Sequence, residues 1–335
     1  MRRCAVFRFD ASCKLGGGHA YRCLTLAQAL ARVGWRVVVA ASSETFQVVP
    51  AVDRFKSIIV SGGADDEIAA IGAAVGSAEL LVVDHYDRDA VFESKARSLF
   101  QRILVIDDLA DRHHDADLLL DQSYGRTSDE YTGLVPRSCR LLVGTAYALL
   151  RPEFTEMRAR ALARRTGELG HIMVSFGLTD LDNMTARVLN GLRDIAVPWT
   201  ADVILGSAAP HIEDMRAFAD EFAGRVRVLV GVNDMAALMS RADLAIGATG
   251  TTSWERCCLG LPSLAVVLAD NQRRIASELA SAGAIELMNV DPPEAIRYSV
   301  EGLAASPARM REMSRVAAAI CDGKGTHRVV DVLQQ

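Results

Sequence analysis

The sequence Gly16-Gly17-Gly18-His19 decides the fold of the amino-terminal half, because it joins an apolar run at residues 4–9 to an amphipathic stretch at residues 20–33. Three glycines let the backbone come close to a ligand. The helix that follows directs its unpaired N–H groups to the same place, which suits an anion. His19 adds a side chain that exchanges protons near neutral pH. The loop therefore predicts proton-transfer chemistry on a nucleotide-linked substrate.

Composition limits the classes of protein to consider. The chain has 335 residues, a length that favours two domains over one. Half of the residues are hydrophobic and only 6% are aromatic, which favours an α/β protein over a β-sandwich. The formal net charge of −5 provides no basic field for nucleic acid or for an anionic membrane.

Cysteine usage and hydropathy bear on the compartment. The seven cysteines are scattered, Cys257 and Cys258 are adjacent, and no CxxC pair indicates zinc. The apolar run after Arg2 and Arg3 is too short for a signal peptide, and no run approaches the ~20 residues of a membrane span. We expect reduced, mostly buried cysteines in a soluble cytoplasmic enzyme.

In the first half, apolar runs that predict strands alternate with amphipathic stretches that predict helices. This is the pattern of a parallel sheet covered by helices. The expected strands cover residues 4–9, 36–41, 57–60, 80–84, 103–107, 118–120 and 141–143. The expected helices cover residues 20–33, 65–75 and 89–102.

The second half repeats the pattern after a charged connection at residues 151–170. The expected strands cover residues 171–176, 201–205, 225–230, 244–247, 263–268 and 285–288. The expected helices cover residues 183–195, 210–223, 235–241, 252–260, 272–282, 293–304 and 307–321, before a short tail. We therefore expect two Rossmann-like doubly wound α/β domains, residues 1–155 and 156–335, that face each other across a ligand-binding cleft.

His19 and residues near two strand ends are the candidates for catalysis in the first half. A functional His19 is favoured over a histidine that only bonds locally, and its natural role is general base toward water or acid toward a leaving group. Asp10 follows the first strand and could orient His19, hold the loop or simply form a turn. Tyr86, after the strand at residues 80–84, either bonds a sugar or is an ordinary loop aromatic, and is favoured over His85.

A metal site at Asp107-Asp108 and His113-His114-Asp115-Ala116-Asp117 is not favoured. Adjacent residues of a strand point to opposite faces, and no regular spacing gathers a ligand set. Asp107 closing a strand and Asp108 in a turn explain the pair more simply, while one of these carboxylates could still reach the cleft.

Two loops in the second half have the residue types of a phosphate site. In Ser175-Phe176-Gly177-Leu178-Thr179-Asp180, Gly177 and the helix start near Asp182 either border a diphosphate or form a plain turn. In Gly247-Ala248-Thr249-Gly250-Thr251-Thr252, continued by Ser253, backbone N–H groups and hydroxyls gather where a helix begins, the arrangement that a pyrophosphate needs. The second loop is the stronger candidate.

Glu255 and the pair Asn271-Gln272 each allow two interpretations. Thr252-x-x-Glu255 fits a capping box, but an acidic residue at this place also binds ribose hydroxyls in many nucleotide sites. Asn271 is a natural N-cap, although the two amides could also bind sugar hydroxyls or orient a water. Spacing leaves Glu255 open and favours the cap for Asn271.

Taken in order, these motifs resemble the UDP-sugar hydrolases of pseudaminic acid biosynthesis, which have a two-domain glycosyltransferase-B-like fold. The resemblance runs over nearly the whole chain. It rests on Arg8-Phe9-Asp10, Gly16-Gly17-Gly18-His19-x-x-Arg22-Cys23, Val83-Asp84-His85-Tyr86, Ile106-Asp107-Asp108-Leu109-Ala110-Asp111-Arg112, Ser175-Phe176-Gly177, Gly250-Thr251-Thr252-Ser253-Trp254-Glu255-Arg256 and Asn271-Gln272. It implies cleavage of the bond between the anomeric carbon and UDP in a 2,4-diacetamido-2,4,6-trideoxy sugar.

The resemblance also implies roles for single residues. His19 would be the general base for the attacking water, and Tyr86 and Asn271 would lie near the reacting sugar. The residues implied to bind the UDP-sugar are Gly16, Gly17, Gly18, Arg22, Gly177, Gly250, Thr251, Thr252, Ser253, Gln272 and, at the ribose, Glu255. No metal or cofactor is implied, because backbone donors would take up the charge of the leaving group. No nucleic acid or membrane span is implied either. A monomer is expected.

Two positions depart from the resemblance. Leu178 and Leu181 stand where these hydrolases commonly have glycine and proline, and Leu178 lacks the backbone freedom of glycine. Two other functions are compatible with the motifs: a glycosyltransferase that uses a UDP-amino sugar donor, and a nucleotide-sugar binding protein without activity.

Overall fold

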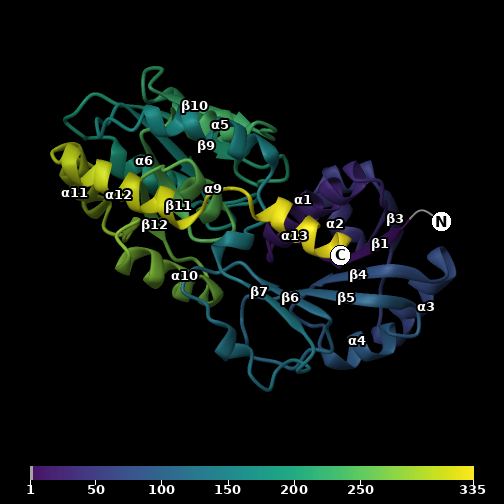
Figure 1. The fold of residues 1–335 in the computed structure, drawn as a ribbon. Coiled ribbons are helices and arrows are strands. Elements are labelled where there is room, and N and C mark those ends of the chain that lie inside the picture. Colours follow the sequence, from purple (N-terminus) through teal and green to yellow (C-terminus); the bar gives the residue numbers. More distant parts are fainter. Residues whose placement is uncertain (1–2) are drawn as a thin grey trace. The chain divides into compact units, whose positions relative to one another are not determined.

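The computed structural model describes residues 3–335, which form two compact units. Unit 1 contains the described residues up to Leu150 together with Lys324–Gln335, and unit 2 contains Arg151–Gly323 (Figure 1). Each unit has its own parallel β-sheet, with helices in the connections between strands.

Unit 1 is built on a seven-stranded sheet. Its strands are β1 (Cys4–Phe9), β2 (Arg36–Ala41), β3 (Lys56–Ile59), β4 (Ala78–Asp84), β5 (Phe100–Ile106), β6 (Leu118–Asp121) and β7 (Arg140–Val143). Its helices are α1 (Gly18–Arg32), α2 (Ser43–Val48), α3 (Ala64–Val75), α4 (Ala90–Ala96) and α13 (Gly325–Gln334), with 3-10 turns at Pro50–Arg54, Ser128–Tyr131 and Thr145–Tyr147.

Unit 2 is built on a six-stranded sheet. Its strands are β8 (His171–Ser175), β9 (Thr200–Leu205), β10 (Val226–Val230), β11 (Leu244–Ala248), β12 (Ser263–Val266) and β13 (Ile285–Leu287). Its helices are α5 (Pro152–Ala163), α6 (Met184–Leu192), α7 (Ile212–Asp220), α8 (Met235–Arg241), α9 (Thr252–Cys258), α10 (Asp270–Ser281), α11 (Pro293–Ala304) and α12 (Pro307–Ile320).

Both sheets have the Rossmann strand order. The order is β3-β2-β1-β4-β5-β6-β7 in unit 1 and β10-β9-β8-β11-β12-β13 in unit 2, and neighbouring strands are parallel. The order reverses between β1 and β4 and again between β8 and β11. In α/β proteins, ligands bind beyond the carboxyl ends of the strands at such a switch point. The loops after these four strands are therefore the places to search for a site.

The strands were predictable because their apolar runs are nearly continuous. Every residue of β1 is buried, as are most residues of β4 and β11. A parallel sheet covered by helices hides both faces, so both sets of alternating side chains must be apolar. Each unit has a hydrophobic cluster of its own, which includes Val6 and Leu81 in unit 1 and Val174 and Ile246 in unit 2.

Two segments differ from the expectation. The helix expected at residues 89–102 ends at Ala96, because Phe100 already pairs with Ala78 in the sheet and cannot remain helical. The expected tail contains α13, which buries an apolar stripe that includes Val329 and Leu333 and packs beside α1 in unit 1 (Figure 1).

The course of α13 changes the division of the chain. A division at residues 155/156 leaves the carboxyl terminus in the second half, whereas the units here separate at Leu150/Arg151 and again at Gly323/Lys324. Gly325 makes the return possible, since a Cβ at this position would overlap the backbone of Ala148. Within residues 3–335, no helix has the combination of length and hydropathy that a membrane span requires.

Candidate active site

The glycine loop places His19 in the first turn of α1. The helix begins at Gly18 with Gly17 as its N-cap, no side chain caps it, and its first turn holds no acidic residue. Gly16 has a φ of 77°, which a glycine adopts at little cost. The helix start is therefore not neutralised by a carboxylate of its own first turn, and its N–H groups can take an anion.

Asp84, the last residue of β4, is the partner of His19. The register of β4 on β1 sets Asp84 beside Phe9, and His19 Nδ1 lies 2.9 Å from Asp84 Oδ1. Nε2 pairs with none of residues 3–335, yet it is not among their buried polar atoms that lack a partner. This edge of the ring therefore reaches the surface, and the side chain keeps 9% of its area exposed.

Arg22 holds the carboxylate of Asp84, which is fully buried. Arg22 Nε donates to Asp84 Oδ2 over 2.6 Å, and Nη2 donates to Oδ1 over 2.7 Å. Burial opposes ionisation of this carboxyl, but the charge and hydrogen bonds of Arg22, with the contact from His19, outweigh burial and hold the pKa of Asp84 below its usual value. Asp84 is therefore an anion at neutral pH.

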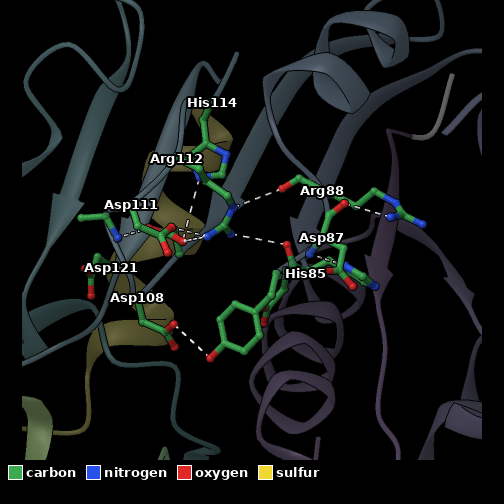
Figure 2. A network of polar contacts seen from close by, with 12 residues as sticks. His85, Asp87, Arg88, Asp108, Asp111, Arg112, His114 and Asp121 are labelled. Carbon is green, nitrogen blue, oxygen red and sulfur yellow. Dashed lines mark hydrogen bonds and ion pairs between the residues drawn. The ribbon is translucent and has the colours of Figure 1, made fainter. Parts of the chain in front are cut away.

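Asp108 and Tyr86 complete the cluster. Arg22 Nη1 donates to Asp108 Oδ2 over 2.9 Å. The Tyr86 hydroxyl donates to Asp108 Oδ1 over 3.2 Å, the contact drawn as a dashed line from Asp108 in Figure 2. The Tyr86 ring stands edge-on to the His19 imidazole, with centroids 4.6 Å apart and an interplanar angle of 76°. Of the predicted residues, the structure thus brings His19, Arg22 and Tyr86 together. It adds two carboxylates to them.

The contacts of Arg22 differ from those that we expect of a substrate ligand. Its side chain is 3% exposed, and Nε, Nη1 and Nη2 all donate to carboxylates. A phosphate could take these donors only by leaving the buried carboxylate of Asp84 and the half-buried one of Asp108 without their cation, which is unfavourable. The contacts of Arg22 are therefore internal to unit 1.

Asp10 has other partners than His19. It pairs with Arg8 at 2.9 Å, accepts from the Ser42 N–H over 2.7 Å and lies 3.0 Å from His85 Nε2. These contacts, with burial opposing them, hold the pKa of Asp10 below its usual value. Of the alternatives for Asp10, orientation of His19 is wrong, because the chain leaving β1 carries Asp10 toward the start of α2.

Arg112 joins the loops that follow β4 and β5 (Figure 2). Its Nη1 lies 2.9 Å from Asp107 Oδ1, and its Nη2 donates to the His85 carbonyl over 3.4 Å. Asp107 directly follows β5 and accepts from the Ala110 N–H and the Tyr131 hydroxyl. Asp107 is therefore a structural carboxylate. Within residues 3–335, no three His, Cys, Asp or Glu side chains come together as a metal site would require.

In unit 2, the loop after β8 satisfies its own helix. Asp180 accepts from the N–H groups of Met184 and Thr185 over 2.8 and 3.0 Å, and Asn183 accepts from Ala186. A carboxylate already occupies the start of α6, so this helix end is not open to a diphosphate. Gly177, with a φ of 91° and open space at its Cβ position, remains the accessible part of this loop.

The loop after β11 has unpaired donors instead. Within residues 3–335, no acceptor lies on the backbone N–H groups of Gly250, Thr251 and Thr252. The hydroxyl of Thr249 and the Nε of Arg256 are buried without a hydrogen-bond partner. No atom lies within 4 Å of a Cβ built on Gly250. The loop therefore offers neutral backbone and hydroxyl donors, together with the cationic Arg256, beside open space.

Glu255 does not form the capping box. The N-cap of α9 is Thr251 rather than Thr252, and it makes no side-chain cap. Burial raises the pKa of Glu255, and its carboxylate lies 3.5 Å from Arg151 Nη2. The cap interpretation is wrong, because α9 begins at Thr252, one residue earlier than a box with Thr252 as N-cap would need. Ribose binding stays a prediction.

Asn271 is also not an N-cap. Helix α10 begins at Asp270 after an Ala269 cap, so Asn271 lies inside the first turn and its side chain is exposed. Gln272 Oε1 accepts from the Leu268 N–H over 3.1 Å and secures the loop after β12. The amide nitrogen of Gln272 and the exposed side chain of Asn271 stay candidates for contact with a sugar.

No protein-family model matches the chain. It is 28% identical over 207 residues to the spore coat polysaccharide biosynthesis protein SpsG of Bacillus subtilis, and the match spans 60% of each chain. It is 25% identical over 281 residues to the UDP-2,4-diacetamido-2,4,6-trideoxy-beta-L-altropyranose hydrolase of Campylobacter jejuni, covering 83% of this chain and 96% of that one.

A shorter match, 32% identical over 166 residues, is to the UDP-N-acetylglucosamine–N-acetylmuramyl-(pentapeptide) pyrophosphoryl-undecaprenol N-acetylglucosamine transferase of Xanthomonas campestris pv. campestris. It covers 45% of this chain and 38% of the transferase.

Solved structures agree in fold. MurG of Acinetobacter baumannii superposes with a TM-score of 0.65 at 18% identity, covering 99% of both chains. Anabaena Alr3699/HepE, solved in complex with UDP-glucose, superposes with a TM-score of 0.60 at 13% identity, again covering 99% of both chains. The chain therefore has a glycosyltransferase-B-like fold and resembles the Campylobacter jejuni UDP-sugar hydrolase in sequence.

Proposed function

We propose that this chain hydrolyses a UDP-linked 2,4-diacetamido-2,4,6-trideoxyhexose and releases UDP and the free sugar, for use in nonulosonic (pseudaminic) acid biosynthesis. One observation carries the proposal. Beside an uncapped glycine-rich helix start, His19 turns Nδ1 to a buried carboxylate and leaves Nε2 at the surface. The substrate class follows from the 25% identical hydrolase, whose matched region spans 83% of this chain.

The reaction needs a base and a stabilised leaving group. His19 Nε2 takes a proton from water while the water oxygen bonds to the anomeric carbon. The bond from that carbon to the diphosphate oxygen breaks, and UDP leaves with both bonding electrons. N–H donors fixed around open space stabilise the charge that develops on the diphosphate.

Unit 2 supplies the groups suited to the nucleotide. The unpaired N–H groups of Gly250, Thr251 and Thr252 fit a diphosphate, and the Glu255 carboxylate fits ribose hydroxyls. Asn271 and the Tyr86 phenol are assigned to the reacting sugar. Arg22 and Asp10 have no place among these ligand contacts.

Substrate turnover without an acceptor tests the proposal. The full chain is incubated with UDP-2,4-diacetamido-2,4,6-trideoxy-β-L-altropyranose in ¹⁸O-labelled water. We expect UDP and free sugar in equal amounts, with the label in the sugar, because the anomeric carbon–oxygen bond breaks. Label in the phosphate of the products, or the absence of UDP, contradicts the proposal.

A glycosyltransferase is the second candidate. It is favoured by the match to the Xanthomonas campestris transferase and by the fold shared with MurG. A transferase needs a second substrate, so its UDP release would depend on an added sugar or lipid acceptor. Release at the full rate without an acceptor separates the hydrolase from this alternative.

A further inference from the structure

Five side chains, His19 and four others, form a closed ring of contacts, which we call the His19 ring. His19 contacts Asp84, Asp84 pairs with Arg22, Arg22 bridges to Asp108, Asp108 accepts from Tyr86, and the Tyr86 ring returns to the imidazole. The residues come from α1, the end of β4 and the loops after β4 and β5. Three segments far apart in sequence thus converge on one imidazole.

The contacts in the His19 ring determine which nitrogen of the imidazole carries the proton. Asp84 is a buried anion that can only accept, so Nδ1 facing it must be the donor. A neutral imidazole has one N–H, and Nε2 then keeps its lone pair. This lone pair is on the edge of the imidazole that reaches the surface.

His85 provides an internal contrast. Its Nδ1 accepts from the Asp87 N–H over 3.0 Å, and its Nε2 lies 3.0 Å from the Asp10 carboxylate. The protein's own groups therefore use both nitrogens of His85. Two histidines close to the same sheet edge thus have opposite tautomers, and only His19 retains a free basic nitrogen.

We propose that Asp84 and Arg22 are positioning residues for His19: Asp84 fixes the Nδ1–H tautomer, and Arg22 holds the two carboxylates in place and binds no phosphate. This assignment rests on the proposed function for its catalytic consequence, but not for the tautomer itself. Asp108 acts through both neighbours, because it fixes Arg22 from one oxygen and the Tyr86 hydroxyl from the other. The anchored phenol ring then limits rotation of the imidazole.

The tautomer can be measured in the wild-type chain without substrate. Imidazole ¹⁵N shifts are recorded above pH 8 on ¹⁵N-histidine-labelled protein, and His19 is assigned by its absence in His19→Gln. We expect a protonated Nδ1 and an unprotonated Nε2. An Nε2–H tautomer, or an equal mixture, overturns the proposal. Because the tautomer is measured on wild type, this result does not depend on the folding of a variant in the His19 ring.

Two variants and a control test the assigned roles. Asp84→Asn removes the anion at nearly constant shape, so we expect a mixed tautomer and a loss in kcat on the order of 10²-fold or more. Arg22→Lys keeps a charge but not the bidentate fork, and should lower kcat while leaving the dissociation constant for UDP within about twofold. Asp10→Asn should change the shifts of His85 and leave those of His19 unchanged.

The outcomes separate this inference from the proposed function. A roughly tenfold weaker binding of UDP to Arg22→Lys, with an unchanged His19 tautomer, would show that Arg22 is a phosphate ligand. If wild type does not turn over the UDP-sugar but Asp84→Asn changes the tautomer, the proposed function fails and the positioning role stands. If wild type turns over the UDP-sugar but His19 has the Nε2–H tautomer, the proposed function stands and the positioning role fails.

Discussion

Unit 1 and unit 2 have the same Rossmann strand order but very different loops at the switch point. In unit 1, charged side chains at the ends of β1 and β4 are paired within the unit, Asp10 with Arg8 and Asp84 with Arg22 of α1. In unit 2, the end of β11 carries glycine and small hydroxyl residues, whose N–H groups lack acceptors in the described chain. The loop chemistry, rather than the topology, distinguishes the two units.

Under the proposed function, we expect the two units to act in different steps of the reaction. Ionic contacts out of water hold a side chain in one orientation, which proton transfer requires, although desolvation of the charges is costly. Neutral backbone donors suit a bound anion, since they offer hydrogen bonds without a competing carboxylate. On this comparison, we expect changes in unit 1 to alter the rate and changes in unit 2 to alter binding.

The largest expected effect is on the chemical step in unit 1. His19→Gln removes the basic nitrogen, so kcat for UDP release should fall by roughly 10²–10⁴-fold with little change in UDP affinity. The matched control is His85→Gln, since His85 uses both ring nitrogens in contacts within the protein. The control should remain within a few-fold of wild type in kcat. Equal losses in the two variants would remove the distinction between these histidines.

Acid pH should weaken unit 1 more than unit 2. In unit 1, burial raises the pKa values of Asp84, Asp10 and Asp108, but their basic partners lower them by more. The pKa values of these three carboxyls therefore lie below their usual range. Groups with a lowered pKa stabilise the fold above their unfolded value near 4, and this contribution is lost as the pH falls below it. In unit 2, burial raises the pKa of Glu255 and Glu286, so their contribution is present at low pH and is lost as the pH rises.

Asp121 in unit 1, whose pKa is raised, and Asp202 in unit 2, whose pKa is lowered, run against this balance. Hydrogen exchange of the full chain between pH 6 and 3, corrected for intrinsic rates, measures the difference. Peptides from β4 and β5 should lose protection before those from β8 and β11, by a few kcal/mol in order of magnitude. The opposite order would contradict the assignment of charge to unit 1.

A smaller effect is expected on binding in unit 2. Gly250→Ala adds a methyl group to open space without backbone strain, so the fold should persist while UDP approaches the loop less closely. We expect KM to rise roughly tenfold, about 1.4 kcal/mol, with kcat within about twofold. The matched control is Gly302→Ala, on the exposed side of α11, which should stabilise the fold by about 0.5–1 kcal/mol and leave KM unchanged. An unchanged KM in both variants would exclude this loop as the diphosphate site.

The smallest effect concerns the buried hydroxyl of the same loop. Among residues 3–335, Thr249 Oγ1 has no hydrogen-bond partner, so Thr249→Val replaces an unsatisfied group by a methyl of similar size. The free energy of unfolding without ligand should stay constant or rise by up to about 1 kcal/mol. Thermal unfolding with and without UDP measures the change. A clear loss of stability would mean that the hydroxyl is satisfied by water in solution.

Local chemistry made much of the fold predictable. The run at residues 4–9 coincides with β1, because a strand buried on both faces is apolar throughout. The glycine loop likewise gave the start of α1 to within two residues. Helix ends were harder: α4 stops at Ala96 because pairing in the sheet competes for the residues that follow.

The site was only partly predictable. His19 and Tyr86 stood out by residue type and by place beside strand ends, and the structure brings them together. Asp84 was not predicted to contact His19, although an acidic residue at the end of an apolar run could have indicated a functional carboxylate. Capping was the favoured interpretation of Asn271 and one of two open interpretations of Glu255, and it is wrong for both, because a shift of one residue in a helix start changes which side chain caps it.

The sequence alone determined the two sets of strands and the glycine loop with its histidine, since these depend on local hydropathy and on backbone freedom. Only the tertiary structure decided that the partner of His19 is Asp84, 65 positions away, and that Arg22 faces carboxylates. The pairing follows from the register of β4 on β1 and from burial, which forces charges to find each other. Neither can be read from the spacing of residues along the chain.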